Sequence, residues 1–366
     1  MQSTLEHHDR VRGICLNGSI WFDDFFKATS FSFPALETLY LRNKGVELEI
    51  PDTFLGGSDL SNLRRLRSLT LCSVSLTSIS GLLSSATSLT DLVLGLYTSF
   101  GPSAEMSLVA SLQGMHCLRK LDLVFGSLSS PSQPLIPKEV VPLSKLTTFR
   151  YNGYSVFLYA LVAGISAPSL QAIDIELHDS IQSPTVHLSR FIGEIEEHYH
   201  FIDVSIHSLS GFVFSFSLCI RRREHEAIWP RELRLESSFD PTRFPESMVR
   251  MSDALSVRLA TLEVLVVKFD RYRADYVWED YLPWHRFYRH LSSVKTLRIT
   301  CSMARTLYQY HGEPDGLFVL SALEEIHLFD LETDESKRGT ILAAFQPFVN
   351  AREQSGRPVN VFFHTG

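Results

Sequence analysis

The amino-acid sequence predicts an α/β solenoid, in which short parallel strands line one side and helices or loops return along the other. Three observations favour this class. An apolar spacing of three and then two residues recurs along the chain, and helical periodicity fills several segments between its copies. The 366 residues also exceed the roughly 250–300 that one compact core holds. Stacked repeats escape that limit because each one is buried by its neighbours.

The recurring unit has apolar residues at its first, fourth and sixth positions, as in Leu66-Leu69-Leu71. Because strand side chains alternate, positions four and six point to one side and positions three, five and seven to the other. This spacing is typical of a leucine-rich repeat, which contributes one short strand per copy. The copies begin at Val11, Leu36, Leu66, Leu89, Leu118, Leu146, Leu170, Phe201, Pro230, Leu262, Val294 and Leu323.

The segments between the copies predict the returning side of the solenoid. Residues 105–115, 187–198 and 284–291 space their apolar residues as amphipathic helices do. The uncharged stretch "VFLYALVAGI" predicts a buried helix, because its ten residues are too few for the roughly 20 that span a bilayer. Phe212 to Ile220 alternates with period two instead, so we expect an extra strand or hairpin on this return.

This pattern divides the chain into three parts. Residues 1–10 form a tail, residues 11–332 form a solenoid of about twelve irregular repeats, and residues 333–366 form a C-terminal cap. We expect the solenoid to curve into an arc or horseshoe with the strands on its concave face. In the cap, Asp334 is a candidate helix N-cap, Gly356 follows the helix, and residues 358–363 form a final strand. The helix carries one apolar stripe, formed by Ile341, Leu342, Phe345, Phe348 and Val349.

Composition narrows the classes of partner. The net charge is −7 and the isoelectric point is near 6.1, whereas domains that bind nucleic acid through its phosphates are usually basic. The five cysteines are scattered and contain no CxxC pair, which favours reduced thiols in an intracellular protein, cytoplasmic or nuclear. The opening "MQSTLEHHDR" lacks the features of a secretory signal. We therefore expect neither nucleic acid nor a membrane as a partner.

The sequence predicts no catalytic residue, no cofactor and no metal. The sequence contains no P-loop, GxGxxG or GxSxG motif, and "HEAIW" carries Trp229 where a zinc-protease helix needs its second histidine. The strongest metal candidate, "EEHYHF" together with His207, spreads its donors over a helix end and a turn, while zinc needs three or four converging ligands. Solvated histidines at a helix C-terminus are the favoured interpretation.

Two further segments each allow a functional and a structural interpretation. "RRREHE", Arg221 to Glu226, is interpreted as a solvated loop rather than a phosphate or nucleic-acid contact, because three arginines are followed by two glutamates in a chain of negative net charge. The aromatic-rich segment from Asp270 to Trp284 is predicted to pack onto the solenoid core rather than to anchor a partner.

The concave face is the predicted binding surface, because solenoids bind through such faces. Positions three, five and seven are mainly acidic between Asp174 and Glu236, so we expect neighbouring strands to place acidic side chains about 5 Å apart and to suit a partner with a basic surface. The candidate partner-binding residues are Tyr40, Arg42, Asp122, Arg150, Asp174, Glu176, Asp203, His207, Glu232, Arg234 and Glu236.

The repeats and two specific segments resemble the leucine-rich-repeat region of fungal F-box-like proteins of the type found in mushroom-forming fungi. The segments are "WHRFYRHLSSVKTLRI" and above all "LAAFQPFVNAREQSGRPVNVFF", and the resemblance runs from about Val11 to the end. It implies a horseshoe that recruits a protein, in some members as the substrate receptor of a ubiquitin ligase. An F-box would precede the repeats, and this sequence enters its first repeat within about a dozen residues. We therefore do not expect docking to the ligase adaptor.

The leading hypothesis is a non-enzymatic interaction scaffold that binds a protein on its concave face, as a substrate-recognition module related to F-box proteins. The alternative is a metal-dependent protein or an enzyme built around the histidine-rich region 196–207.

Overall fold

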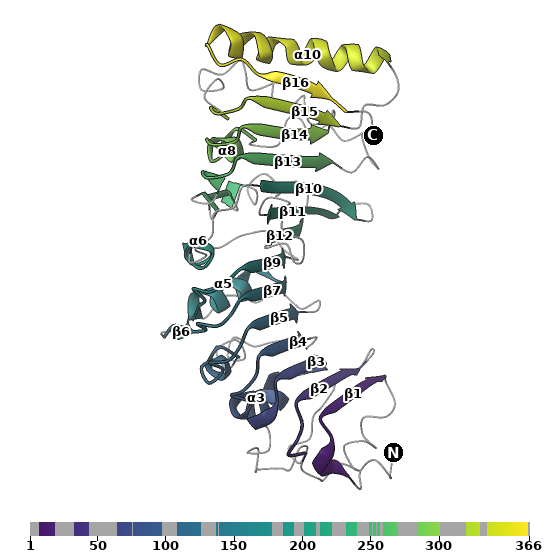
Figure 1. Ribbon diagram of the computed structural model, residues 1–366, viewed down its shortest axis with the longest axis vertical. Helices are drawn as coiled ribbons and strands as arrows, with labels where there is room; N and C mark the ends of the chain where they lie inside the picture. The colour runs from purple at the N-terminus through teal and green to yellow at the C-terminus, as the bar shows by residue number, and fades with distance from the viewer. Residues whose placement is uncertain are drawn as a thin grey trace. The chain divides into compact units, whose positions relative to one another are not determined.

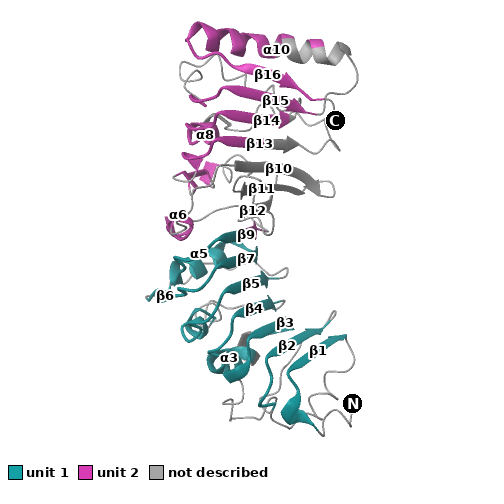
Figure 2. Ribbon diagram, viewed as in Figure 1, with its two compact units in different colours: residues 1–173, 194–196 teal, residues 174–193, 197–366 magenta. Residues whose placement is uncertain are grey.

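The computed structural model describes residues 7–18, 33–43, 64–74, 76–96, 108–125, 137, 139–177, 186–193, 201–209, 213–221, 232–239, 249–250, 252–253, 255–256, 259–269, 284–300, 320–329 and 335–364. The chain forms two compact units, shown in Figure 2. Unit 1 contains residues 1–173 and 194–196, and unit 2 contains residues 174–193 and 197–366.

Six strands of unit 1 lie in chain order and pair in parallel (Figure 1). Equivalent template positions face one another, so that Leu39 pairs with Leu69, Leu69 with Leu92, and Leu92 with Leu121. The predicted parallel repeat is confirmed for these strands. They are β1 (Gly13–Gly18), β2 (Thr38–Asn43), β3 (Ser68–Val74), β4 (Asp91–Leu96), β5 (Lys120–Phe125) and β7 (Thr148–Gly153).

One backbone carbonyl per repeat fixes this register. The carbonyl at template position two accepts the N–H groups of positions two and three of the next copy: Glu37 O accepts Arg67 N at 2.8 Å and Ser68 N at 3.0 Å. The same pair of bonds recurs at the carbonyls of Arg12, Arg67, Thr90, Arg119, Thr147, Glu263 and Lys295. Each strand therefore begins level with the one before it.

The leucines at positions four and six form the core of the ladder. Leu39, Leu41, Leu69, Leu71, Leu92 and Leu94 are all 0% exposed, because each lies between its equivalents on two neighbouring strands. Side chains at positions three, five and seven occupy the other side of the same strands, which we call the open face. Most described open-face side chains are half-buried or exposed.

Helices occupy several returning segments, to one side of the strands in Figure 1. In unit 1 these are α3 (Leu76–Ser85) and α5 (Ser155–Gly164), beside a small parallel pair of strands, β6 (Val141–Pro142) and β8 (Ile165–Ser166). Helix α5 is the predicted buried helix, and all its residues except Val156 are buried. In unit 2, α6 (Val186–Gly193) and α8 (Trp284–Arg289) occupy returning segments. Across the described residues, no helix is long and apolar enough to cross a membrane.

Unit 2 departs from the predicted all-parallel arrangement. Its strands lie in the order β9 (from Asp174 on), β12, β11, β10, β13, β14, β15 and β16, and β11 is antiparallel to both of its neighbours. The segment expected as an extra strand or hairpin on the return is therefore a strand of the main sheet. The bounds are β9 (Ala172–Leu177), β10 (Phe201–Leu209), β11 (Val213–Arg221), β12 (Glu232–Phe239), β13 (Val264–Phe269), β14 (Thr296–Thr300), β15 (Glu325–Phe329) and β16 (Asn360–Phe363).

The register of β10 also differs from the template. The predicted copy places Phe201 level with Leu262, whereas Phe201 pairs with Val264 and Ile202 pairs with Leu265. The difference is two residues. An even difference leaves every residue on the predicted face of the strand, because side chains alternate with period two. Strand β10 is nine residues long and β13 is six, so the two strands can pair in more than one register.

The C-terminal segment forms helix α10 (Glu335–Gln354), which is followed by β16 (Figure 1). Of the predicted stripe, Phe345 and Phe348 are buried, while Asp334 lies outside the described residues. Gly356 has φ 73°, and the N–H of Arg357 donates to the Arg352 carbonyl at 2.9 Å. This left-handed residue and its bond form a Schellman motif, which reverses the chain into β16.

Arg352 joins α10 to the last repeats. Its side chain is 1% exposed, and its guanidinium donates from Nη1 to the Leu320 carbonyl at 3.2 Å and from Nη2 to the Leu323 carbonyl at 2.8 Å. Leu323 opens the last template copy. Burial lowers the pKa of Arg352, and the charge of Arg357 adds to this effect. The turn that precedes β15 is therefore held by a buried cation together with the backbone bond from the Leu323 N–H to the Leu320 carbonyl.

We expect Arg352→Ala to lower the free energy of unfolding by about 1–3 kcal/mol, because the Leu323 carbonyl loses the guanidinium donor and the Leu320 carbonyl keeps only its backbone donor. Arg352→Lys should recover only part of this loss, since an ammonium lacks the planar fork that reaches two carbonyls. The matched control is the exposed Arg357→Ala, expected to stay within about 0.5 kcal/mol of the wild type. Urea unfolding measures all three variants, and an Arg352→Ala protein as stable as the control would refute this role.

Candidate functional site

The predicted binding residues of unit 1 all occupy open-face positions of their strands, but one of them is buried. Arg42 and Arg150 are exposed and Tyr40 is half-buried. Asp122 occupies position five of β5, so we expected it to be accessible, but it is only 8% exposed. The expectation that Asp122 presents a carboxylate to a partner is wrong on accessibility. Its strand neighbours at the same level are Val93 and Arg150.

The predicted acidic row of unit 2 is interrupted. Asp174 and Glu176 lie half-buried on β9, and the next strand is β12, which carries Glu232, Arg234 and Glu236. The strand that holds Asp203 and His207, β10, is separated from β9 by β12 and β11.

The expected neighbourhood of Asp203 and Asp174 is therefore wrong, because the local hairpin reverses the order of the strands. Arginines also enter the row. Arg234 pairs with Cys219, which pairs with Asp203, and Arg221 pairs with Glu232. Arg221 thus belongs to a sheet strand rather than to the predicted loop, and the rest of "RRREHE" lies outside the described residues.

A close approach of two strands shapes the open face of unit 1. A Cβ added at Gly95 would lie 3.2 Å from the Cys72 Cα and 3.3 Å from its Cβ, so a side chain at this position of β4 would require β3 to shift slightly. Beside it, β3 bulges at Ser73, which has φ 66° and donates from Oγ to the Asn43 carbonyl at 2.9 Å. A left-handed serine costs conformational energy, which the bulge and this hydrogen bond help to offset.

Burial raises the pKa of two acidic groups on the open face of unit 1, Cys72 on β3 and Asp122 on β5. Burial raises the pKa of the Cys72 thiol; the Arg42 charge opposes this rise and the Asp122 charge adds to it. Burial likewise raises the pKa of Asp122, against the opposing charges of Arg150 and Lys120. The Oδ1 atom of Asp122 is buried and has no hydrogen-bond partner among the described residues. A raised pKa disfavours the thiolate and the carboxylate, which are the forms that act as nucleophile and metal ligand.

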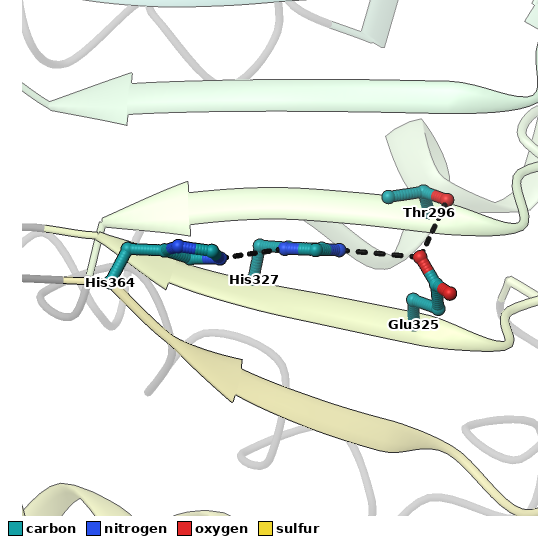
Figure 3. Close-up of polar contacts among 4 residues, drawn as sticks. All are labelled: Thr296, Glu325, His327 and His364. Carbon is teal, nitrogen blue, oxygen red and sulfur yellow. Dashed lines mark hydrogen bonds and ion pairs between the residues drawn. The ribbon is translucent and has the colours of Figure 1, made fainter.

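The open face of unit 2 carries a cluster that we call the imidazole cluster: Thr296, Glu325, His327 and His364 (Figure 3). The Nδ1 of His327 lies 2.8 Å from the Nε2 of His364. The other ring nitrogen of His327, Nε2, lies 3.3 Å from the Glu325 Oε2, which also accepts from the Thr296 Oγ1 at 3.5 Å. Three neighbouring elements contribute, because β14, β15 and the residue after β16 lie side by side.

Aromatic rings hold the two imidazoles in place. Phe362 stacks on His327 with ring centroids 4.9 Å apart, and Phe329 stacks on His364 at 4.7 Å. Phe362 is 41% exposed, which is unusual for a large apolar side chain, and the exposed Arg298 pairs with His327 from β14. The cluster therefore combines imidazole, carboxylate, aromatic and guanidinium groups on one accessible surface.

Sequence reasoning missed the imidazole cluster as a site. Glu325, His327 and Phe329 stand at positions three, five and seven of the last copy, so the template already placed them on one face. His364 directly follows the predicted final strand, and the pairing of β16 with β15 brings it beside them. Pairing the final strand with the last copy would have revealed the juxtaposition.

Metal ligation at the predicted histidine-rich region is not described by the structure. Residues 194–200 lie outside the described residues, and for His207 the structure gives only its position in β10. Within the described ranges, no group of three or more histidine, cysteine, aspartate or glutamate side chains could hold a metal ion.

Comparisons with known proteins do not assign this chain to a family. No protein-family model matches the sequence, and no curated protein matches it. Among solved structures, the leucine-rich repeat-containing protein LegL7 from Legionella pneumophila aligns over 89% of this chain and 91% of its own, with 11% sequence identity and a TM-score of 0.29. So slight a likeness carries no argument. The parallel register and the buried ladder described above define an α/β architecture of the leucine-rich-repeat type.

The Asp122→Asn variant tests whether the buried carboxyl keeps its proton to a higher pH in the folded protein than in the unfolded one. Because the pKa of Asp122 is raised in the folded protein, its proton contributes stability that is present at acidic pH and lost as the pH rises through the raised value. The asparagine variant lacks this loss. We expect its free energy of unfolding to rise relative to that of the wild type between the ordinary aspartate pKa, about 4, and neutral pH. Urea unfolding at several pH values measures this, and a difference that stays constant with pH would contradict it.

Proposed function

We propose that the protein is a non-enzymatic scaffold that binds a protein partner through the open faces of its sheets. The observation that carries this proposal is the asymmetry of the strands. In β2, β3, β4 and β5 the position-four and position-six side chains are 0% exposed, while the other side of the strands presents charged and aromatic side chains such as Arg42, Arg150 and Phe362. Regularly spaced strands with one uncovered face are the surface that solenoid proteins use for recognition.

The partner in this proposal has a basic surface that meets β9 and β12. Asp174 and Glu176 on β9 and Glu232 and Glu236 on β12 bring four carboxylates to two adjacent strands. Arg234 interrupts them, so a partner that pairs with this surface needs an acidic group among its basic ones. Complementary charges of this kind mainly raise association rates and exclude wrong partners.

We further propose a relation to the substrate-recognition modules of fungal F-box-like proteins. The support is the resemblance of the C-terminal segment, whose "REQSGRPVNVFF" runs through the end of α10, the Gly356 turn and β16. In this proposal the open faces capture the protein to be recognised.

The test first isolates the partner, by cross-linking and mass spectrometry with the full chain as bait in its source cells. Binding kinetics are then measured between the purified partner and two variants. Asp174→Lys combined with Glu176→Lys should slow association by about tenfold and weaken its dependence on salt, because both carboxylates lie within one screening length, about 8 Å, of a bound basic surface. The matched control is Glu353→Lys, a charge reversal at an exposed position of α10.

Stability should change little in either variant, because substitutions at accessible positions usually move it within about 0.5 kcal/mol. If the control slows association and the β9 variant does not, the partner binds elsewhere and the proposed surface is wrong.

A further inference from the structure

We propose that His327 and His364 bind a transition-metal dication on the open face of unit 2, with His327 Nδ1 and His364 Nε2 as the two protein ligands. Cu²⁺ or Zn²⁺ suits this site best, because imidazole nitrogen favours them over Mg²⁺ and Ca²⁺, which take oxygen ligands.

The geometry of the two rings is close to that of a metal site. The ligand nitrogens are 2.8 Å apart, the rings are 14° from coplanar, and their centroids are 5.0 Å apart, so the imidazoles meet edge to edge (Figure 3). Two nitrogens bound to one tetrahedral metal at about 2.0–2.1 Å are roughly 3.3 Å from each other. The two nitrogens therefore need to move apart by only about half an ångström to hold the ion between them.

The far nitrogen of His327 has the partner that metal-binding histidines usually have. Its Nε2 lies 3.3 Å from the Glu325 carboxylate, which accepts a hydrogen bond from Nε2–H in the tautomer that carries its proton there. In that tautomer Nδ1 keeps its lone pair for a metal. Thr296 donates to the same carboxylate oxygen and holds it in place. The negative charge of Glu325 also favours a cation at this position, whereas the exposed Arg298 on β14 opposes it.

The backbone holds both ligands before any metal arrives. His327 lies within β15, and the N–H of His364 donates to the Leu328 carbonyl at 2.9 Å, which extends the pairing of β16 beyond its last residue. The stacked Phe362 and Phe329 restrict the rotation of each imidazole. Little conformational entropy is left to lose on binding, which favours affinity.

Two protein ligands leave coordination positions for water or for a donor from another molecule. In the metal-free protein the nitrogens share an N–H···N hydrogen bond, so the ion replaces one proton between the rings. A metal with open positions on an exposed surface can accept a ligand from a partner or bind solvent.

Isothermal titration of the full chain, stripped of metal with a chelator, tests the proposal with Cu²⁺ and Zn²⁺, and with Ca²⁺ for comparison. We expect one Cu²⁺ per chain, bound more tightly than Zn²⁺, with no binding of Ca²⁺ at this site. His364→Ala and His327→Ala should each weaken the binding at least tenfold. Glu325→Gln should weaken it by about tenfold to a hundredfold, as loss of an orienting carboxylate does.

His290→Ala is the matched control, because His290 Nε2 lies 3.1 Å from Asp253 Oδ1 and thus forms a histidine–carboxylate pair without a second imidazole. Its affinity for Cu²⁺ should equal that of the wild type. His364 lies beyond the last strand, so its removal spares the ladder, and far-ultraviolet circular dichroism checks that each variant is folded. If the wild type binds Cu²⁺ no more tightly than the His364→Ala protein, the two rings form only a hydrogen bond and the proposal is overturned.

Discussion

No repeat of this protein can bury its own leucines, and the rest of the structure depends on that constraint. A strand of about six residues contributes two inward side chains, and these leave water only when a neighbouring strand carries equivalent side chains at the same level. The position-two carbonyl supplies that level by accepting two N–H groups from the next repeat. Burial and register therefore reinforce each other: the ladder requires alignment, and the backbone bonds provide it. The open face is left free to vary, which is why charged, aromatic and imidazole groups gather there.

Each unit carries a cluster of polar side chains on its open face, and the two clusters differ in how closely they are packed. In unit 1, β3 and β4 approach closely at Cys72 and Gly95, and burial raises the pKa values of Cys72 and Asp122. In unit 2 the final strand brings His364 beside His327 and leaves Phe362 partly exposed. Polar groups are aligned there without being covered, which is the condition for binding another molecule. The same repeat thus produces a closely packed patch in one unit and an accessible cluster in the other.

The repeat itself could be predicted from the sequence, since Leu69, Leu92 and the other ladder leucines follow a strict spacing. An additional apolar position escaped notice. Three residues before the first position, Phe33, Ala86, Met115, Leu143, Ala167, Leu259, Leu291 and Leu320 are all buried, and each carbonyl accepts the N–H of the first template residue. The order of β10, β11 and β12 could not be read from spacing, because period-two alternation is the same in a return strand and in a sheet strand. The burial of Asp122 depends on residues of neighbouring strands such as Val93 and Arg150, which local patterns do not reveal.

Native-state hydrogen exchange on a Leu71→Ala variant tests the shared ladder most directly. Leu71 is 0% exposed on β3, and its adjacent residue Thr70, on the open face of the same strand, gives the matched control Thr70→Ala. If neighbouring repeats bury one another, Leu71→Ala should lower the free energy of unfolding by about 2–5 kcal/mol and speed amide exchange in β2, β3 and β4 together. Thr70→Ala should change exchange little. Faster exchange confined to β3, or equal effects of the two substitutions, would contradict the account.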